Sequence, residues 1–138
     1  MSRFAGTVIV LAVLLAGCSR NQSISPEELK SDSAELASIA AESELFADFV
    51  ASGHSTDAYA KGHSKSLREQ LSDLRKDLQK KHADPDLQDT LTSLQKLSDQ
   101  LDEALTALPS NSRDPRWQNL VGSFAHIAQA AQSPRRAP

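Results

Sequence analysis

Helix-start signals divide this chain into four amphipathic segments, and they constrain its fold more than any other feature. Three of them pair a capping side chain with a proline suited to the first helical position: Ser25-Pro26, Asp84-Pro85 and Asp114-Pro115. Glu28 completes a capping box with the first pair, and Ser55 or Thr56 can open one more helix. Gly53 and Pro109 are stop signals. The sequence therefore predicts four helices and no strand.

Apolar residues recur at three- and four-residue steps in each segment, as expected for helices with one buried face. The first stripe consists of Leu29, Leu36, Ile39, Ala40, Ser43, Phe46, Ala47 and Val50. The second consists of Tyr59, His63, Leu67, Leu71, Leu74 and Leu78. The third is made of leucines between Leu87 and Leu108, and the fourth contains Trp117, Leu120, Val121, Phe124, Ile127, Ala128 and Ala131. Short connections make neighbouring helices antiparallel, so the predicted fold is an all-α, antiparallel up-and-down four-helix bundle.

Charge is distributed unevenly between the first two segments. The first is mainly acidic and the second is rich in lysine and arginine, which favours their pairing. Exposed ion pairs stabilise weakly, so the apolar stripes are expected to supply most of the stability. The net charge of −3 argues against a nucleic-acid partner, which would require a strongly basic surface.

The first eighteen residues have the features of a secretory leader that ends in a cysteine. Arg3 supplies positive charge, Thr7 to Leu15 form an apolar run, and Leu15-Ala16-Gly17-Cys18 follows. This segment resembles the lipobox of bacterial lipoproteins, in which the cysteine is lipidated and becomes the N-terminus after cleavage. The resemblance implies a removed signal peptide over 1–17 and a lipidated tether over 18–24. A helical domain over 25–132 and a disordered tail over 133–138 complete the predicted organisation.

A lipid on Cys18 would attach the protein to a membrane without a spanning helix. The apolar run is too short to span, because a span needs about 20 apolar residues. In enteric-type bacteria an aspartate after the lipidated cysteine indicates inner-membrane retention. Ser19 stands there in this chain, which favours the periplasmic face of the outer membrane. Cys18 is the only cysteine, so we expect no disulfide and no cofactor beyond the covalent lipid.

The residues that could support catalysis or metal binding do not form a recognisable motif. The four histidines, His54, His63, His82 and His126, lack the spacing of a metal site in a bundle. His63 lies on the second stripe, where it could act as a ligand or a proton-transfer group. We interpret it instead as a histidine near the bundle end, beside Tyr59.

Acidic residues and serines give no stronger signal. Asp99, Asp102 and Glu103 are interpreted as a solvated helix face rather than a calcium site, because no ligand-bearing loop follows them. There is no nucleophile elbow and no glycine-rich phosphate loop. The sequence therefore predicts a protein that is not an enzyme and holds no metal.

The last predicted helix contains an unusually long stretch without charged side chains. Between Trp117 and Gln132 there is no aspartate, glutamate, lysine or arginine. Contact patches are depleted in charge and often contain an aromatic residue. Trp117, Gln118 and Gln129 are therefore candidate partner contacts, although Trp117 could equally belong to the core, since it begins the fourth apolar stripe. The alternative is a helix buried on more than one side, or a simple polar wall.

These features favour a non-catalytic binding or adaptor module with a protein partner in the cell envelope. Secretion pilotins are similar at class level, as small helical lipoproteins, although those with a disulfide differ from this chain. A structural spacer similar to the peptidoglycan-linked lipoprotein is the alternative. That lipoprotein ends in a lysine, whereas this chain ends Arg136-Ala137-Pro138 and has prolines that would break a long coiled coil. A metal carrier or hydrolase is the third and weakest hypothesis.

Overall fold

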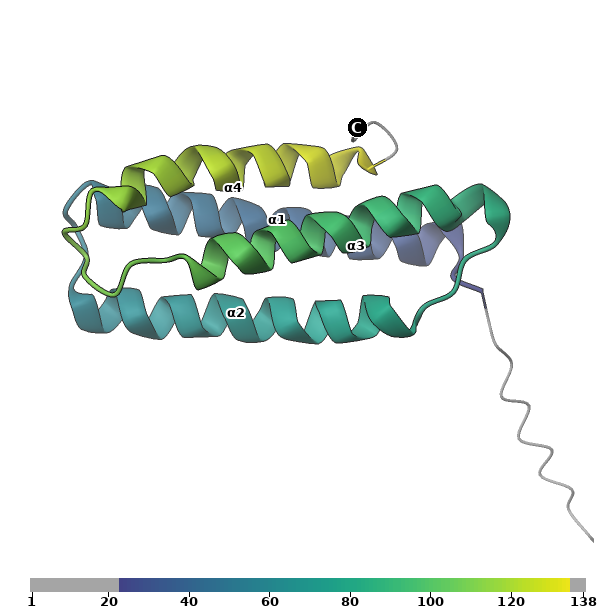
Figure 1. Cartoon of the computed structure of the whole chain (residues 1–138), viewed down its shortest axis with the longest axis horizontal. Coiled ribbons are helices and arrows are strands. Elements are labelled where there is room, and N and C mark those ends of the chain that lie inside the picture. The colour runs from purple at the N-terminus through teal and green to yellow at the C-terminus, as the bar shows by residue number, and fades with distance from the viewer. Residues whose placement is uncertain (1–22, 135–138) are drawn as a thin grey trace, which may run out of the picture.

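The computed structural model describes residues 23–134, which form a bundle of four antiparallel helices (Figure 1). The helices are α1 (Pro26–Ala51), α2 (Asp57–Lys80), α3 (Pro85–Thr106) and α4 (Arg116–Gln132). The predicted all-α bundle is therefore confirmed. The predicted signal peptide over 1–17, the lipidation site Cys18 and residues 135–138 lie outside the described residues. None of the helices in the described part is long and apolar enough to cross a membrane.

The predicted helix signals act at two of the four starts as expected. The Ser25 hydroxyl accepts a hydrogen bond from the Glu28 backbone N–H at 3.2 Å, and the Glu28 carboxylate accepts one from the Ser25 N–H at 2.9 Å. Thr56 caps α2 by accepting a hydrogen bond from the Tyr59 N–H. Gly53, with a φ of 79°, occupies the left-handed conformation that lets the chain turn from α1 to α2.

The two aspartates before prolines have different partners. The Asp84 side chain makes no capping bond and instead accepts a hydrogen bond from the Ser23 hydroxyl at 2.8 Å. The Asp114 carboxylate accepts bonds from the backbone and the guanidinium of Arg116. These bonds from Arg116 also lower the pKa of Asp114. Asp84 therefore joins the segment before α1 to the α2–α3 connection, whereas Asp114 holds the end of the α3–α4 connection against the start of α4.

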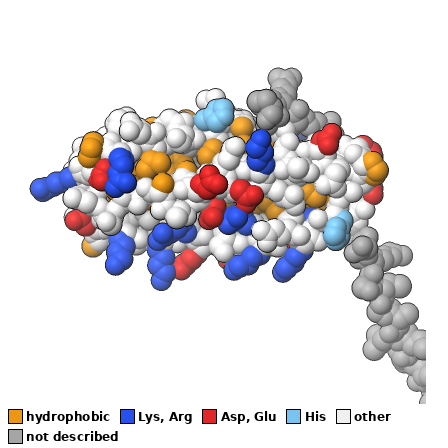
Figure 2. Space-filling model, viewed as in Figure 1, with side chains coloured by type: hydrophobic (Ala, Val, Ile, Leu, Met, Phe, Trp, Pro, Cys, Tyr) orange, Lys and Arg blue, Asp and Glu red, His pale blue; other side chains and the backbone are white. Residues whose placement is uncertain are grey.

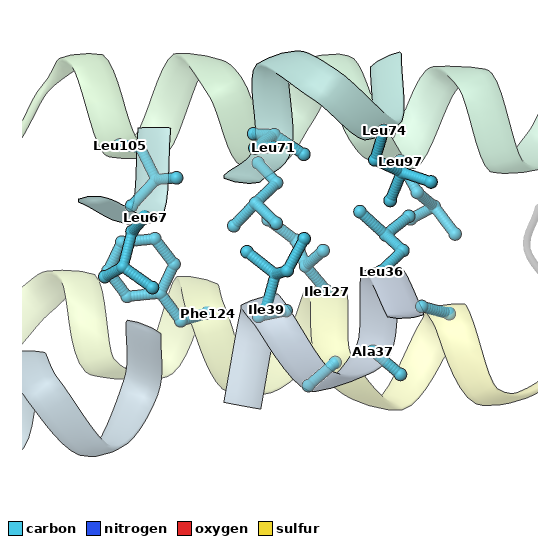
Figure 3. Close-up of a cluster of buried hydrophobic side chains, with 14 of the residues drawn as sticks. Leu36, Ala37, Ile39, Leu67, Leu71, Leu74, Leu97, Leu105, Phe124 and Ile127 are labelled. Atoms are coloured by element: carbon cyan, nitrogen blue, oxygen red, sulfur yellow. The ribbon is translucent and has the colours of Figure 1, made fainter. Parts of the chain in front are cut away.

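The core consists of the inward stripes of all four helices. Figure 3 shows leucines of α2 and α3 pointing toward Leu36 and Ile39 of α1 and toward Phe124 and Ile127 of α4. The predicted first and third stripes are buried, apart from the half-buried Leu108. The second stripe is buried only from Leu67 onward, because Tyr59 is exposed and His63 is half-buried. The bundle is therefore tightly closed along its length but not at the start of α2.

The folded domain begins two residues before the predicted boundary at Ser25. Ile24 is buried, and its backbone N–H donates a hydrogen bond to the His82 carbonyl at 2.7 Å. The Ser23 hydroxyl bonds Asp84 in the same connection between α2 and α3. These contacts hold the chain against the bundle just before α1, so the described chain enters the bundle at this end, called here the tether end after the predicted tether over 18–24.

Ion pairs connect α2 to both of its neighbours. Basic side chains line the edge of the bundle formed by α2, at the bottom of Figure 2. Arg75 contacts Asp99 at 2.7 Å and Asp102 at 2.9 Å, both on α3. Sequence analysis placed these acids on a solvated face and paired α2 with α1. Asp99 and Asp102 do lie on a solvated face, with side chains 58% and 37% exposed, and the structure adds that Arg75 contacts both of them across the α2–α3 interface.

One ion pair is largely removed from solvent. The Lys81 ammonium donates a hydrogen bond to the Asp32 carboxylate of α1 at 2.7 Å and lies 2.8 Å from Asp77. Burial alone would lower the pKa of Lys81, but the hydrogen bonds to both carboxylates outweigh it and raise this pKa. The raised pKa means that the pair stabilises the folded state fully at neutral pH. On the alkaline side, this contribution is lost as the pH rises beyond the ordinary lysine pKa of 10.5.

We expect Lys81→Met to lower the free energy of unfolding by about 1–3 kcal/mol at pH 7, because Asp32 would remain buried without its partner. Lys80→Met is the matched control, since Lys80 is exposed and lies one residue away. Its effect should stay within about 0.5 kcal/mol. Urea unfolding of both variants measures the difference. Equal stability of the two would show that solvent replaces Lys81 at Asp32.

Candidate protein-interaction site

The large hydrophobic side chains that are well exposed in residues 23–134 gather at one place. Leu45 is 72% exposed, Tyr59 51% and Phe49 43%. Leu45 and Phe49 lie one turn apart on α1, and Tyr59 lies on the first turns of α2. These three residues, with Glu42, Phe46 and His63, surround one surface hollow of about 260 Å³. We call these six residues the aromatic patch.

The patch arises from the way in which the chain turns between α1 and α2. Phe46 belongs to the inward stripe of α1 and is buried, so it forms the floor. Leu45 and Phe49 lie beside that stripe on the outer surface. The Gly53 turn and the Thr56 cap bring the start of α2 back alongside. Tyr59 and His63, one turn apart on α2, therefore face Phe46 and Phe49 across the hairpin.

Aromatic contacts hold these rings in a fixed arrangement. Tyr59 and His63 stack with ring centroids 5.7 Å apart and planes inclined by 7°. Phe46 contacts the His63 ring at 4.6 Å and meets Tyr59 edge-on at 6.3 Å. Phe49 packs against Tyr59 at 6.0 Å. Such contacts add about 0.5–1.5 kcal/mol per aromatic pair beyond area burial, so the exposed rings are held in place before any partner arrives.

One carboxylate lies at the edge of this aromatic surface. Glu42 Oε1 lies 3.2 Å from His63 Nε2, and the Glu42 side chain is 44% exposed. No lysine or arginine lines the hollow, although Lys61 and Lys65 lie on the same turns of α2. The patch therefore combines an apolar aromatic surface with a single negative charge.

The patch lies at the end of the bundle away from the tether end. Figure 1 shows the α1–α2 and α3–α4 connections together at this distal end, opposite the start of α1. At a rise of 1.5 Å per residue, Leu45 is about 29 Å along α1 from Pro26. The patch is therefore presented about 30 Å from the point where the chain enters the bundle.

The structure separates the candidate contacts that the sequence indicated on α4. Trp117 is fully buried, and its indole Nε1–H donates a hydrogen bond to the Asn111 carbonyl at 2.9 Å. It is a core residue that packs edge-on against Phe46 at 5.4 Å, and it cannot serve as a surface anchor. Gln118 and Gln129 are exposed on the outer face of α4. That face carries no large exposed hydrophobic side chain.

The other described titratable residues are placed as follows. Within residues 23–134 no group of three or more histidine, cysteine, aspartate or glutamate side chains could hold a metal ion. His63 lies near the bundle end and stacks on Tyr59, as predicted. Asp99 and Asp102 contact Arg75.

A second hollow lies at the tether end. It is a groove of about 620 Å³ between the first turns of α1, the start of α3 and the end of α4, with Leu29 and Leu87 on its wall. The groove exists because α4 is short. The Ser33 hydroxyl donates a hydrogen bond to the Ala131 carbonyl near the end of α4, so the antiparallel α4 stops about two turns short of the first residue of α1 and leaves these turns uncovered. Pro134, the last described residue, lies at its edge.

Sequence analysis missed Leu45 and Phe49, and a signal for them was present. Both are large apolar residues four positions apart that fall outside the inward stripe of the first helix. An apolar pair displaced from the buried stripe indicates a second, exposed apolar face.

In comparisons with known proteins, no family model, no curated protein and no solved structure matches this chain. The functional argument therefore depends on the geometry of the site itself.

Proposed function

We propose that this protein is a lipid-anchored, non-catalytic adaptor of the bacterial cell envelope that binds a protein partner through its aromatic patch. The observation that supports this proposal most directly is the clustering of Leu45, Phe49 and Tyr59 on one surface. Exposed apolar groups that gather in one patch mark interaction sites, whereas scattered ones need no explanation. Aromatic residues are also enriched at protein interfaces.

The arrangement of the two ends supports an adaptor. The lipobox at Cys18 would attach the mature chain to a membrane, by the resemblance described above, and the outer membrane facing the periplasm is favoured by Ser19. The aromatic patch lies at the distal end of the bundle, so it would be directed away from the membrane. A lipid at one end and a partner site at the other would recruit that partner to the membrane surface.

A pair of lysine substitutions in the patch tests this proposal. We expect Leu45→Lys with Tyr59→Lys to remove an envelope partner that co-purifies with the wild-type chain after cross-linking in cells. Both side chains are exposed, so the fold should survive, although Tyr59→Lys removes ring contacts to Phe46, Phe49 and His63 that are worth about 0.5–1.5 kcal/mol each. Quantitative mass spectrometry of the cross-linked complexes and urea unfolding measure the two effects.

The control carries the same added charge on the other candidate surface. Gln118→Lys with Gln129→Lys places two lysines on the exposed face of α4 and should change neither partner recovery nor stability. Loss of the partner in this variant, with retention in the Leu45/Tyr59 variant, would move the contact surface to α4. Retention in both variants would contradict an adaptor that uses either surface.

A further inference from the structure

The aromatic patch has a composition that selects one class of partner side chain. We infer that the hollow binds a positively charged side chain, arginine or lysine, that lies next to an apolar residue in the partner protein. This inference deepens the proposed function and rests on it. It follows from the combination of stacked aromatic rings with one carboxylate, and from a lining that contains His63 but no lysine or arginine.

The rings provide the first part of the site. Tyr59 and Phe49 expose ring surface to solvent, and Phe46 lies at the base of the hollow. The face of an aromatic ring is electron-rich, so a guanidinium or ammonium group within about 6 Å of a ring is attracted to it. The hollow of about 260 Å³ has room for a single long side chain.

Glu42 provides the second part. Its carboxylate lies on the rim, and Oε1 contacts His63 while the side chain remains 44% exposed. A carboxylate has two oxygens and about four acceptor positions, so it can bind a further donor while it contacts His63. A guanidinium over the rings could therefore donate hydrogen bonds to Glu42, and such charge-assisted bonds are roughly twice as strong as neutral ones.

The charge on α1 favours the same ligand. On α1 the exposed or half-exposed charged residues are acidic except for Lys30, which lies at the tether end, and Glu44 and Asp48 lie within two turns of Glu42. The exposed Lys61 and Lys65 lie on the adjoining turns of α2, so the charge beyond the hollow is mixed, and Glu42 is the charge inside it that attracts a cation. Leu45, at the outer edge of the hollow, offers apolar contact to the residue beside the cation. The site is therefore suited to a basic–apolar segment.

Two short peptides test this chemistry directly. The probes are acetyl-Leu-Arg-Leu-amide and the same peptide with citrulline, which keeps the shape of arginine but carries no charge. Tyr59 is the only tyrosine and Trp117 the only tryptophan, so isotope labelling of these two types gives one ring signal from the patch and one from the core. NMR titrations of the mature chain in lipid nanodiscs then report binding at Tyr59, while Trp117 reports the integrity of the fold.

We expect the arginine peptide to shift the Tyr59 signals with saturation, and the citrulline peptide to bind at least about fivefold more weakly. Glu42→Gln should reduce arginine binding by a similar factor, since the amide keeps the size of the side chain and removes its charge. Glu35→Gln is the matched control. It lies two turns from Glu42 on the exposed surface of the same helix, outside the hollow, and should leave binding unchanged.

Equal binding of the two peptides, or equal effects of Glu42→Gln and Glu35→Gln, would overturn the inference, as would the absence of binding by either peptide. Loss of the partner on Leu45→Lys with Tyr59→Lys, without arginine binding, would leave the adaptor proposal standing and remove only this chemistry. Arginine binding without any cross-linked partner would support the binding of a cation in the hollow and contradict the adaptor proposal. A Glu42→Gln variant that changes the sedimentation of the chain alone would identify a second copy as the occupant and contradict a distinct partner.

Discussion

Trp117→Ala is expected to lower the free energy of unfolding by about 3–5 kcal/mol, a large part of the roughly 5–15 kcal/mol that stabilises a typical domain. The indole is fully buried, packs edge-on against Phe46, and donates a hydrogen bond to Asn111 in the connection before α4. Its removal would leave a cavity at the distal end, and the Asn111 carbonyl would keep only its hydrogen bond from the Asp114 N–H. Urea unfolding followed by circular dichroism measures the loss.

The neighbouring residue provides the control for this substitution. Gln118 follows Trp117 directly but is exposed, so Gln118→Ala should change stability by no more than about 0.5 kcal/mol. If Trp117→Ala were equally mild, the tryptophan would not be part of the core. The role of a surface anchor, which sequence analysis offered for it, would then return.

Replacing Cys18 with serine is expected to abolish lipid labelling completely, because Cys18 is the only cysteine of the chain. A serine cannot form the thioether of a bacterial lipoprotein, and each buried methylene of the lipid contributes about 0.8 kcal/mol to membrane binding. Any processed chain should therefore appear in the soluble periplasmic fraction. Growth with an alkyne-bearing fatty acid, followed by fractionation, measures both effects.

Two results would contradict the lipid anchor. One is incorporation of the fatty acid into the Cys18→Ser chain, which would place the lipid elsewhere. The other is processed Cys18→Ser chain that stays on the membrane after a high-salt wash. Leu101→Ser is a suitable control, because it damages the buried core and leaves Cys18 intact. It should keep the label even where it lowers the amount of protein.

The bundle could be predicted from the sequence because local signals and periodicity agree. Ser25 with Glu28, Thr56 and Gly53 act as caps and turn as their residue types suggest. The leucines of α3 are buried at the expected spacing. Helix starts and buried faces depend on residues within a few positions of one another, which is why one sequence contains enough information to place them.

The candidate site could not be predicted as completely, because it depends on distances between separate helices. Tyr59 and His63 fit the apolar stripe of α2, yet the position of the hairpin places Tyr59 on the surface. Trp117 had the residue type of an interface anchor, and its burial against Phe46 depends on the packing of α4 on α1. The pairing of Arg75 with Asp99 likewise follows from the α2–α3 interface. Sequence spacing alone contains none of these distances.

Site-specific photo-crosslinking in intact cells tests the proposed partner surface most directly. A photoreactive amino acid at Leu45, compared with one at His126 on the exposed face of α4, places the same probe on the two surfaces. We expect a discrete crosslinked envelope protein from position 45 that becomes weaker when Glu42 is replaced by glutamine, and no such product from position 126. A product from position 126 alone, or none from either position, would contradict the assignment of the aromatic patch as the partner site.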